Sequence, residues 1–261
     1  MGNWAQLYAD LTAQLQAGQA LGFWDNAFVG FYQSFVAAGR WRLYLNGLLT
    51  TLEATILALL LGVVLGVVVA VIRTAHDQQR AGHKNVILGV FNAICKIYTT
   101  IIRGTPMLLQ LYFFFFALPA LIPALNKQKF LCIAIALVCN SAAYVSEVIR
   151  SGIQSVDAGQ SEAAMSLGMN SFQRTWYILV PQALKTILPA LGNEFIMIVK
   201  DTSLASTFFI GDLMTQYLIV RGASYLPLEP LVIVGVIYFI LTFLLSKLFG
   251  FFERRMSRAD R

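Results

Sequence analysis

Charged side chains are scarce in this sequence of 261 residues. Lys, Arg, Asp and Glu make up 12% of it and hydrophobic residues 58%, whereas an average soluble domain is about one quarter charged. A chain with so little charge cannot cover a folded surface with polar groups. The composition therefore excludes a disordered chain, a disulfide-rich secreted module and an ordinary soluble enzyme, and it predicts a membrane protein.

Residues that carry catalysis or bind metals are also scarce. The only two histidines, His76 and His83, lie in a basic loop, which favours solvated surface positions over metal ligands. Cys95, Cys132 and Cys139 form no closely spaced pair, which favours buried free thiols. The sequence also lacks a GxxxxGK(S/T) motif for phosphate binding and a histidine placed to activate a serine. We therefore expect no metal site, no bound cofactor and no enzymatic activity in this chain.

The hydrophobic runs predict an all-α, polytopic membrane protein with about five transmembrane helices. These runs occupy about residues 48–72, 107–121, 130–146, 184–210 and 231–252. Gly62 and Gly66, in the first run, are four residues apart, a pattern that lets two membrane helices approach closely. Residues 85–103 mix apolar positions with Lys96 and Arg103, which predicts a helix lying along the inner face of the membrane.

The same pattern divides the chain into three parts. Residues 1–44 form an N-terminal extension, in which the aromatic stretch 11–39 is interpreted as an amphipathic, interfacial helix or an extra span. Residues 45–252 form the membrane domain, and residues 253–261 form a basic cytoplasmic tail.

The basic residues predict the orientation, because Lys and Arg accumulate on the cytoplasmic side of membrane helices. With the N-terminus outside and the C-terminus inside, inner segments hold eleven basic residues and outer segments five. The inner residues are Arg73, Arg80, Lys84, Arg150, Arg174, Lys185, Lys247, Arg254, Arg255, Arg258 and Arg261. The outer residues are Arg40, Arg42, Lys127, Lys129 and Arg221. A sixth span near residues 20–39 would move only the N-terminus to the inside.

The longest hydrophilic stretch, residues 151–181, contains the signals of a short amphipathic helix. Asp157 or Ser161 can cap its start, Glu162 suits the helix dipole, and Gly168 can end it. Apolar residues that a groove could receive follow, namely Phe172, Trp176 and Ile178, before Pro181 marks a new start. The segment is either a docking element for another protein or an ordinary connecting loop.

A motif in this segment resembles the EAA signature of permease subunits of ATP-binding-cassette importers. It consists of Glu162, Ala163, Ala164, Gly168, Ile178, Val180 and Pro181, with a valine where the family usually has leucine before the proline. Further segments resemble the polar amino-acid branch of that family. They are residues 103–106 with Leu108, Leu109 and Gln110; Asn140 with residues 142–144, Glu147 and Arg150; and residues 200–204. The resemblance covers about residues 45–252.

The resemblance implies the type I importer permease fold, in which two identical or paralogous permease subunits pair around a central pathway in the cell membrane. Each subunit would place the loop 156–181 in a cleft of a cytoplasmic ATPase that uses ATP and Mg, while an extracytoplasmic binding protein delivers the amino acid. The residues implied in this coupling are Gly159, Glu162, Ala163, Ala164, Gly168 and Pro181. No nucleic-acid partner is expected, because the basic residues form no groove.

Charged residues within the fourth span are candidates for substrate binding. An ionised side chain at mid-bilayer costs about 3 kcal/mol, so Glu194 is expected to face a cavity and meet an amino group or a cationic side chain. The alternatives are a structural ion pair with Lys200 or a water-facing carboxylate. Other residues assigned to the substrate pathway are Asn193, Thr202 and Ser203, which can bind a carboxylate, and Gln110.

Four further charged residues are assigned to a gate or to the subunit interface. Lys200 and Asp201 are adjacent, so they point in different directions on a helix and are not expected to pair. Glu147 and Arg150 are three residues apart, which favours a local ion pair. The rival functions are a secondary transporter or channel for small polar solutes, which would be expected to show internal repeats or discontinuous charged helices, and a membrane enzyme.

Overall fold

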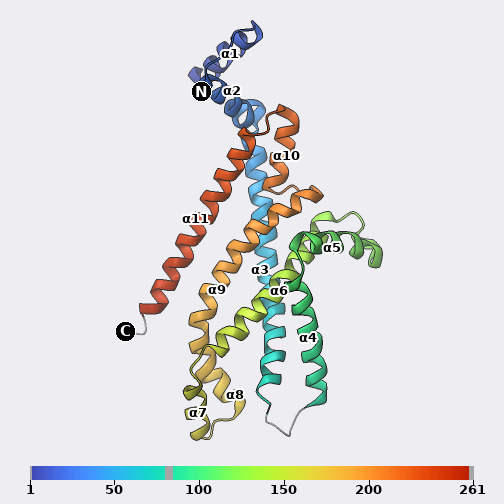
Figure 1. Ribbon diagram of the computed structural model, residues 1–261, viewed down its shortest axis with the longest axis vertical. Helices are drawn as coiled ribbons and strands as arrows, with labels where there is room; N and C mark the ends of the chain where they lie inside the picture. The colour runs from blue at the N-terminus through green and yellow to red at the C-terminus, as the bar shows by residue number, and fades with distance from the viewer. Residues whose placement is uncertain (1, 80–84, 259–261) are drawn as a thin grey trace. The chain divides into compact units, whose positions relative to one another are not determined.

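The computed structural model of the chain describes residues 2–79 and 85–258, and every regular element in these ranges is a helix (Figure 1). Several basic residues counted for the orientation lie outside this part of the chain, namely Arg80, Lys84 and Arg261, as do His83 and the side chain of Arg258. The prediction of an all-α fold is confirmed.

The elements follow one another as α1 (Gly2–Gln16), α2 (Phe23–Phe31), η1 (Tyr32–Val36), η2 (Ala37–Gly39), α3 (Trp41–Asp77), α4 (Val86–Gly104), α5 (Met107–Leu121), η3 (Pro123–Leu125), α6 (Lys129–Gln154), α7 (Ala158–Ser166), α8 (Ser171–Gln173), η4 (Arg174–Leu179), α9 (Val180–Asp201), η5 (Thr202–Phe208), α10 (Leu213–Ser224) and α11 (Glu229–Arg258).

The chain forms two compact units, and two long helices contribute to both. The first unit contains the residues up to Thr51 together with Ser206–Leu241. The second unit contains Leu52–Ala205 together with the residues from Thr242 onwards. Helix α3 passes from the first unit to the second, and α11 does the same near its middle.

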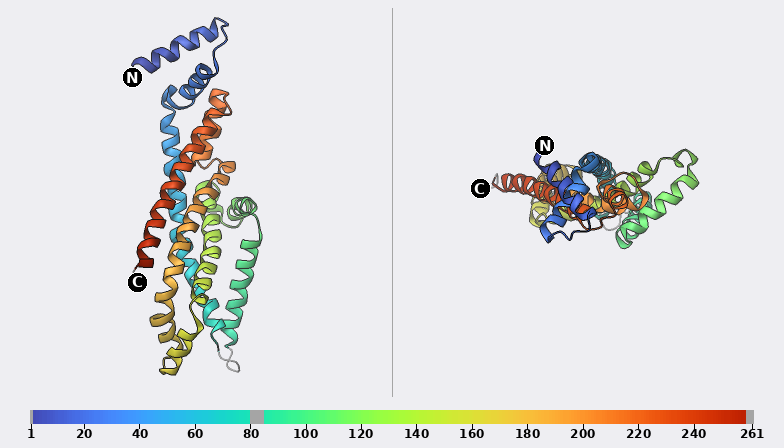
Figure 2. Two further views of the ribbon diagram at one scale, coloured as in Figure 1. Left: turned by 60° about the vertical axis from the view of Figure 1, so that its left-hand side comes forward. Right: turned by 90° about the horizontal axis from the view of Figure 1, so that it is seen from above.

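Helix α6 is the core of the second unit, where it packs against α4, α5 and α9 (Figures 1 and 2). Small residues make this close packing possible. A methyl group added to Gly66 of α3 would lie 2.7 Å from a methyl carbon of Val145 in α6, and Gly62 faces Ser141 in the same way. Gly152 of α6 meets Ile187 of α9. The close helix approach that the spacing of Gly62 and Gly66 predicts is therefore present in the structure.

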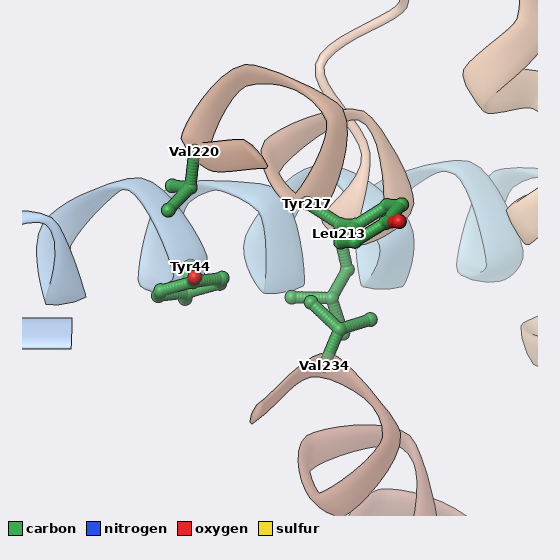
Figure 3. Packing of buried hydrophobic residues seen from close by; sticks show 5 residues of the cluster. All are labelled: Tyr44, Leu213, Tyr217, Val220 and Val234. Carbon is green, nitrogen blue, oxygen red and sulfur yellow. The ribbon is translucent and has the colours of Figure 1, made fainter. Parts of the chain in front are cut away.

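The first unit has a core of its own, formed by Tyr44, Leu213, Tyr217, Val220 and Val234 (Figure 3). Two hydrogen bonds fix it. The Tyr44 hydroxyl donates to the carbonyl oxygen of Ser34 over 3.2 Å, and the backbone N–H of Leu213 donates to the Thr51 hydroxyl over 3.1 Å. Three of the five residues belong to α10, for which the sequence analysis assigned no helix.

The N-terminal extension is not the single helix expected over residues 11–39. Helix α1 ends at Gln16, Gly18 has a φ of +77°, and a new helix, α2, begins at Phe23. Glycine adopts this left-handed conformation readily and is a poor helix former, so the chain breaks here. The short helices that result leave Phe23 and Trp24 exposed, and none in this extension is long enough to be a candidate span.

Four helices in the described part of the chain are long and apolar enough to cross a membrane, or five if the segments Ser171–Phe208 and Leu213–Ser224 form one broken span. The expected number is thus confirmed, but its members differ. Helix α4, expected along the inner face, meets the length and hydropathy of a span, and it runs back beside the end of α3 (Figures 1 and 2). Helix α5, expected to span, has only 15 residues.

Two boundaries also differ from the prediction. Helix α6 continues past Ser146 to Gln154, so Glu147 and Arg150 belong to it rather than following it. The expected fourth span changes at Thr202 from α-helix to a 3-10 helix. The first difference has a clear cause, since Glu147 forms ion pairs with Arg73 and Arg150 and α6 does not have to stop at these charges.

The glycine contacts of α3 generate a matched test. Gly66→Ala places a methyl group against Val145 and the Ala142 carbonyl oxygen, whereas Gly89→Ala, in α4, meets no atom within 4 Å. Gly66→Ala is expected to reduce the free energy of unfolding by about 1–3 kcal/mol, as for overpacked cores. Gly89→Ala is expected to leave it unchanged or to raise it by up to about 1 kcal/mol. Thermal unfolding in detergent measures both, and equal midpoints would refute the close contact.

Candidate functional site

The predicted coupling segment folds as a short helix with defined ends. At its start the Asp157 carboxylate accepts a hydrogen bond of 2.7 Å from the backbone N–H of Gly159. At its end Gly168 has a φ of +79°. The N–H groups of Gly168 and Met169 donate to the carbonyl oxygens of Met165 and Ala164, which is the Schellman pattern that glycine permits. The expected cap and the expected stop are therefore confirmed, with Asp157 rather than Ser161 as the cap.

The two faces of α7 differ. Ala164 is buried, whereas Glu162 and Ala163 are exposed and Leu167, which follows the helix, is 82% exposed. One face thus packs on the protein, and the other presents a carboxylate beside apolar side chains. Nothing within the described part of the chain covers that outer face.

An exposed aromatic group follows α7. Phe172, Trp176 and Tyr177 are each more than half exposed, and the rings of Phe172 and Trp176 stack with their centroids 6.4 Å apart. Asn170 and Gln173 form a reciprocal capping box that fixes the start of this segment. We call α7 together with residues 167–177 the coupling surface.

Side-chain hydrogen bonds tie the coupling surface to the membrane helices. The Thr175 hydroxyl donates to the Gln78 side chain at the end of α3 over 3.2 Å. The Gln182 amide of α9 donates to Gln160 of α7 over 3.3 Å. Pro181 lies in the first turn of α9, as the sequence predicts for a new helix start. The surface is therefore joined to two membrane helices and is not a free loop.

Glu194 lies on α9 and is only 5% exposed. Among the described residues no ion pair joins it to Lys200, and Lys200 itself is exposed. Because Glu194 is buried within the chain, its carboxylate does not face water. The role of Glu194 in substrate binding stays a prediction.

The other residues assigned to the pathway have different environments. Asn193 is exposed, and the buried Thr202 hydroxyl donates to the Val199 carbonyl oxygen over 2.7 Å. Ser203 is half-buried, and so is Asp201.

Gln110, in α5, has a structural role that the sequence analysis did not foresee. Its amide nitrogen donates to the carbonyl oxygens of Ile102 and Thr105 and to the Thr105 hydroxyl, over 2.7–3.0 Å. Its amide oxygen accepts a hydrogen bond of 2.9 Å from Asn140 of α6. This network closes the turn between α4 and α5 and joins it to α6. Because both polar atoms of Gln110 are used inside the chain, no donor is left for a ligand without rearrangement.

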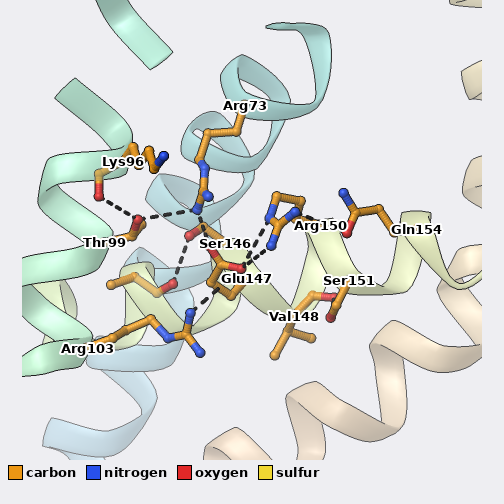
Figure 4. Close-up of polar contacts among 11 residues, drawn as sticks. Arg73, Lys96, Thr99, Arg103, Ser146, Glu147, Val148, Arg150, Ser151 and Gln154 are labelled. Carbon is orange, nitrogen blue, oxygen red and sulfur yellow. Dashed lines mark hydrogen bonds and ion pairs between the residues drawn. The ribbon is translucent and has the colours of Figure 1, made fainter. Parts of the chain in front are cut away.

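Glu147 of α6 is the centre of a polar cluster (Figure 4). Its carboxylate binds Arg73 of α3 and Arg150, three residues ahead of it, and lies 3.7 Å from Arg103 of α4. Arg73 also donates to the Thr99 hydroxyl over 3.3 Å. The expected pair of Glu147 and Arg150 is confirmed as an ion pair. Arg73 and Arg103 were missed as its partners, because nothing in the sequence places three helices at one point.

The sequence and the fold both match known proteins. Residues 80–258 match the family described as the binding-protein-dependent transport system inner membrane component. The arginine transport system permease protein ArtQ of Bacillus subtilis (strain 168) is 38% identical over 187 residues, which cover 67% of this chain and 85% of ArtQ. The glutamine transport system permease protein GlnP of Escherichia coli (strain K12) is 33% identical over 168 residues, 64% of this chain and 77% of GlnP.

A solved structure supports the same relationship. The crystal structure described as an amino acid ABC transporter with histidines aligns with a TM-score of 0.72 and 40% sequence identity. The alignment covers 82% of this chain and 94% of that one. The N-terminal extension lies outside the matched family region.

Proposed function

The chain belongs to the family of binding-protein-dependent transport system inner membrane components, and we propose that it is the permease subunit of an ATP-driven importer for polar amino acids. Members of this family are components of transport systems, and the protein is a multi-pass membrane protein. The observation that carries the proposal is the coupling surface, a short helix capped at both ends whose outer face is uncovered.

The proposed assembly has three kinds of component. Two permease subunits, identical or paralogous, form the pathway, and an extracytoplasmic binding protein delivers the amino acid. A cytoplasmic ATPase binds ATP and Mg, so this chain holds no cofactor. The N-terminus lies outside and the C-terminus inside, which places the coupling surface in the cytoplasm beside the ATPase.

The coupling surface acts as a lever. Its outer residues, Glu162 and Ala163 with the exposed aromatic rings, enter a cleft of the ATPase, while the buried Ala164 holds the helix against the protein. Gly159 accommodates the cap at Asp157, Gly168 ends the helix, and Pro181 starts α9. Because hydrogen bonds join the surface to Gln78 and Gln182, a movement imposed on α7 is passed to α3 and α9 as a rigid-body shift.

Glu194 is proposed to recognise the substrate. A buried carboxylate without a cationic partner in the described residues supplies a counter-charge for an amino group or a guanidinium. Asn193, Thr202 and Ser203 are proposed to bind the substrate carboxylate, with Gln110 positioning the pathway wall through Asn140. The names of relatives that transport arginine and glutamine support polar substrates, some of them basic.

Lys200, Asp201, Glu147 and Arg150 are proposed to set the gate or the subunit interface. Exposed Lys200 is available to a second subunit, whereas Glu147 and Arg150 stay within one chain as an ion pair.

Purification and reconstitution test the proposed function directly. The tagged chain, extracted in mild detergent from its own cell, is expected to retain an ATPase subunit in about one-to-one ratio with permease chains. Proteoliposomes of that complex are expected to accumulate arginine only with internal ATP and the binding protein. Uptake by the chain alone, driven by an ion gradient without ATP, would establish a secondary transporter instead.

Variants of the coupling surface are expected to separate ATP hydrolysis from transport. Glu162→Lys reverses a charge on the outer face, and Gly168→Val forces a branched residue into a left-handed conformation that costs about 1–2 kcal/mol. Both are expected to reduce ATP-driven uptake by about tenfold or more while membrane insertion stays unchanged. The matched controls are Glu253→Lys, an exposed glutamate elsewhere, and Gly18→Val, at a φ of +77° in the N-terminal extension. Full uptake in both coupling variants would contradict the proposal that the coupling surface transmits movement to α3 and α9.

Glu194→Gln tests the substrate site. Removing the charge while keeping the shape is expected to lower arginine uptake by about tenfold, since hydrogen bonds to charged groups are worth about 1.5–3 kcal/mol. Glutamine uptake is expected to fall much less, and Glu53→Gln, at an exposed position of α3, serves as control. An equal loss for both amino acids would instead assign Glu194 a structural role.

A further inference from the structure

The cluster around Glu147 contains more positive than negative charge. Arg73, Arg103 and Arg150 share this one carboxylate, and no other carboxylate in the described ranges pairs with them. The cluster therefore carries a net charge of about two positive units. An anion from outside the chain would compensate it.

The three arginines differ in how much hydrogen-bonding capacity they have left. Arg73 donates to Glu147 and Thr99, and Arg150 donates to Glu147 and Gln154. Arg103 makes no hydrogen bond to any residue of the described chain. It lies 3.7 Å from the Glu147 carboxylate and 5.5 Å from the ring centre of Tyr144, and its side chain is 44% exposed. Its planar fork of N–H donors is thus available to an oxygen-rich anion such as phosphate.

A second cation lies on the same side of α4. Lys96 is seven residues before Arg103, two helical turns or about 10 Å away, and Thr99 lies between them (Figure 4). Lys96 is exposed, and its ammonium group forms no ion pair or hydrogen bond within the described residues. Lys96 and Arg103 therefore flank the point where Thr99 accepts a hydrogen bond from Arg73.

The surroundings of these cations favour a lipid as the source of the anion. The opposite face of α4 is an exposed aliphatic stripe, formed by Ile87, Val90, Ile94, Ile97 and Ile101. Arg73 and Arg150 lie one turn before the ends of α3 and α6, which lead toward the coupling surface. In the proposed orientation this is the cytoplasmic side, where basic sites between membrane helices bind anionic headgroups.

We propose that Lys96 and Arg103, supported by Arg73, bind the phosphate of an anionic phospholipid at the membrane surface. The bound lipid compensates the excess charge around Glu147 and steadies the contact of α3, α4 and α6. Soluble phosphate offers the same chemistry, but it lacks the acyl chains that would hold a lipid in the hydrocarbon bordering the aliphatic stripe of α4.

Lipid retention by the full chain tests the site without any measurement of transport. The protein is purified from nanodiscs that contain equal amounts of phosphatidylglycerol and phosphatidylcholine, and native mass spectrometry counts the lipids that remain bound. The wild type is expected to retain phosphatidylglycerol preferentially. Lys96→Gln combined with Arg103→Gln is expected to reduce that retention by about fivefold for each cation removed.

Two further variants keep the test decisive. Arg42→Gln with Arg221→Gln removes the same charge from exposed positions of the first unit and is expected to retain the lipid. Lys96→Arg with Arg103→Lys keeps the charge and is also expected to retain it, which separates lost binding from misfolding. Equal retention in the Gln double variant and its control would overturn the proposal. Displacement of phosphatidylglycerol by equimolar inorganic phosphate would overturn the lipid source.

Discussion

Close approach of helices around α6 is the constraint on which the second unit depends. In a membrane, an apolar helix face contacts lipid hydrocarbon as favourably as it contacts another apolar side chain. Close packing and polar contacts must therefore hold the helices together. Gly62, Gly66 and Gly152 remove the side chains that would keep α3 and α9 away from α6. The small buried residues of α6, Ala136 and Ala143 among them, complete the contact. Every polar group of this unit is positioned by that packing.

The close packing brings buried polar groups within reach of partners. These groups are of two kinds, those that pair inside the described part of the chain and those that do not. The Gln110 amide and the Glu147 carboxylate find their partners inside the chain, and each group joins three helices. Such networks stabilise one arrangement, because breaking them leaves a costly unpaired group. Glu194 is as well buried as Gln110 but has no ion-pair partner in the described chain. That contrast is the physical argument for a ligand at Glu194 and for structure at Gln110.

The coupling surface has the features that the proposed transmission of movement requires. A helix that begins at a carboxylate cap and ends in a Schellman turn keeps its length and direction when it is pushed. Its bonds to Gln78 and Gln182 lead to helices that belong to the packed unit. In the proposed mechanism, a force applied at Glu162 would reach the region of α9 that holds Glu194 through these hydrogen bonds.

The sequence by itself determined the features that depend on near neighbours in the chain. The uncharged runs identified most of the membrane helices, Asp157 and Gly168 marked the ends of α7, and the spacing of Glu147 and Arg150 identified their ion pair. Helix α10 was missed, although Asp212 and the apolar positions of Leu213, Tyr217 and Val220 give a cap and a helical period. The break of the N-terminal helix at Gly18 was a local signal as well.

Only the tertiary structure decided which distant residues meet. Arg73 and Arg103 are 74 and 44 positions from Glu147, and no sequence pattern predicts that their helices cross beside it. The same packing places Arg103 of α4 beside Glu147 and Tyr144 of α6. The reason is physical. Hydropathy records the cost of a charge in lipid, whereas the position of a charged helix depends on partners that only the folded chain supplies.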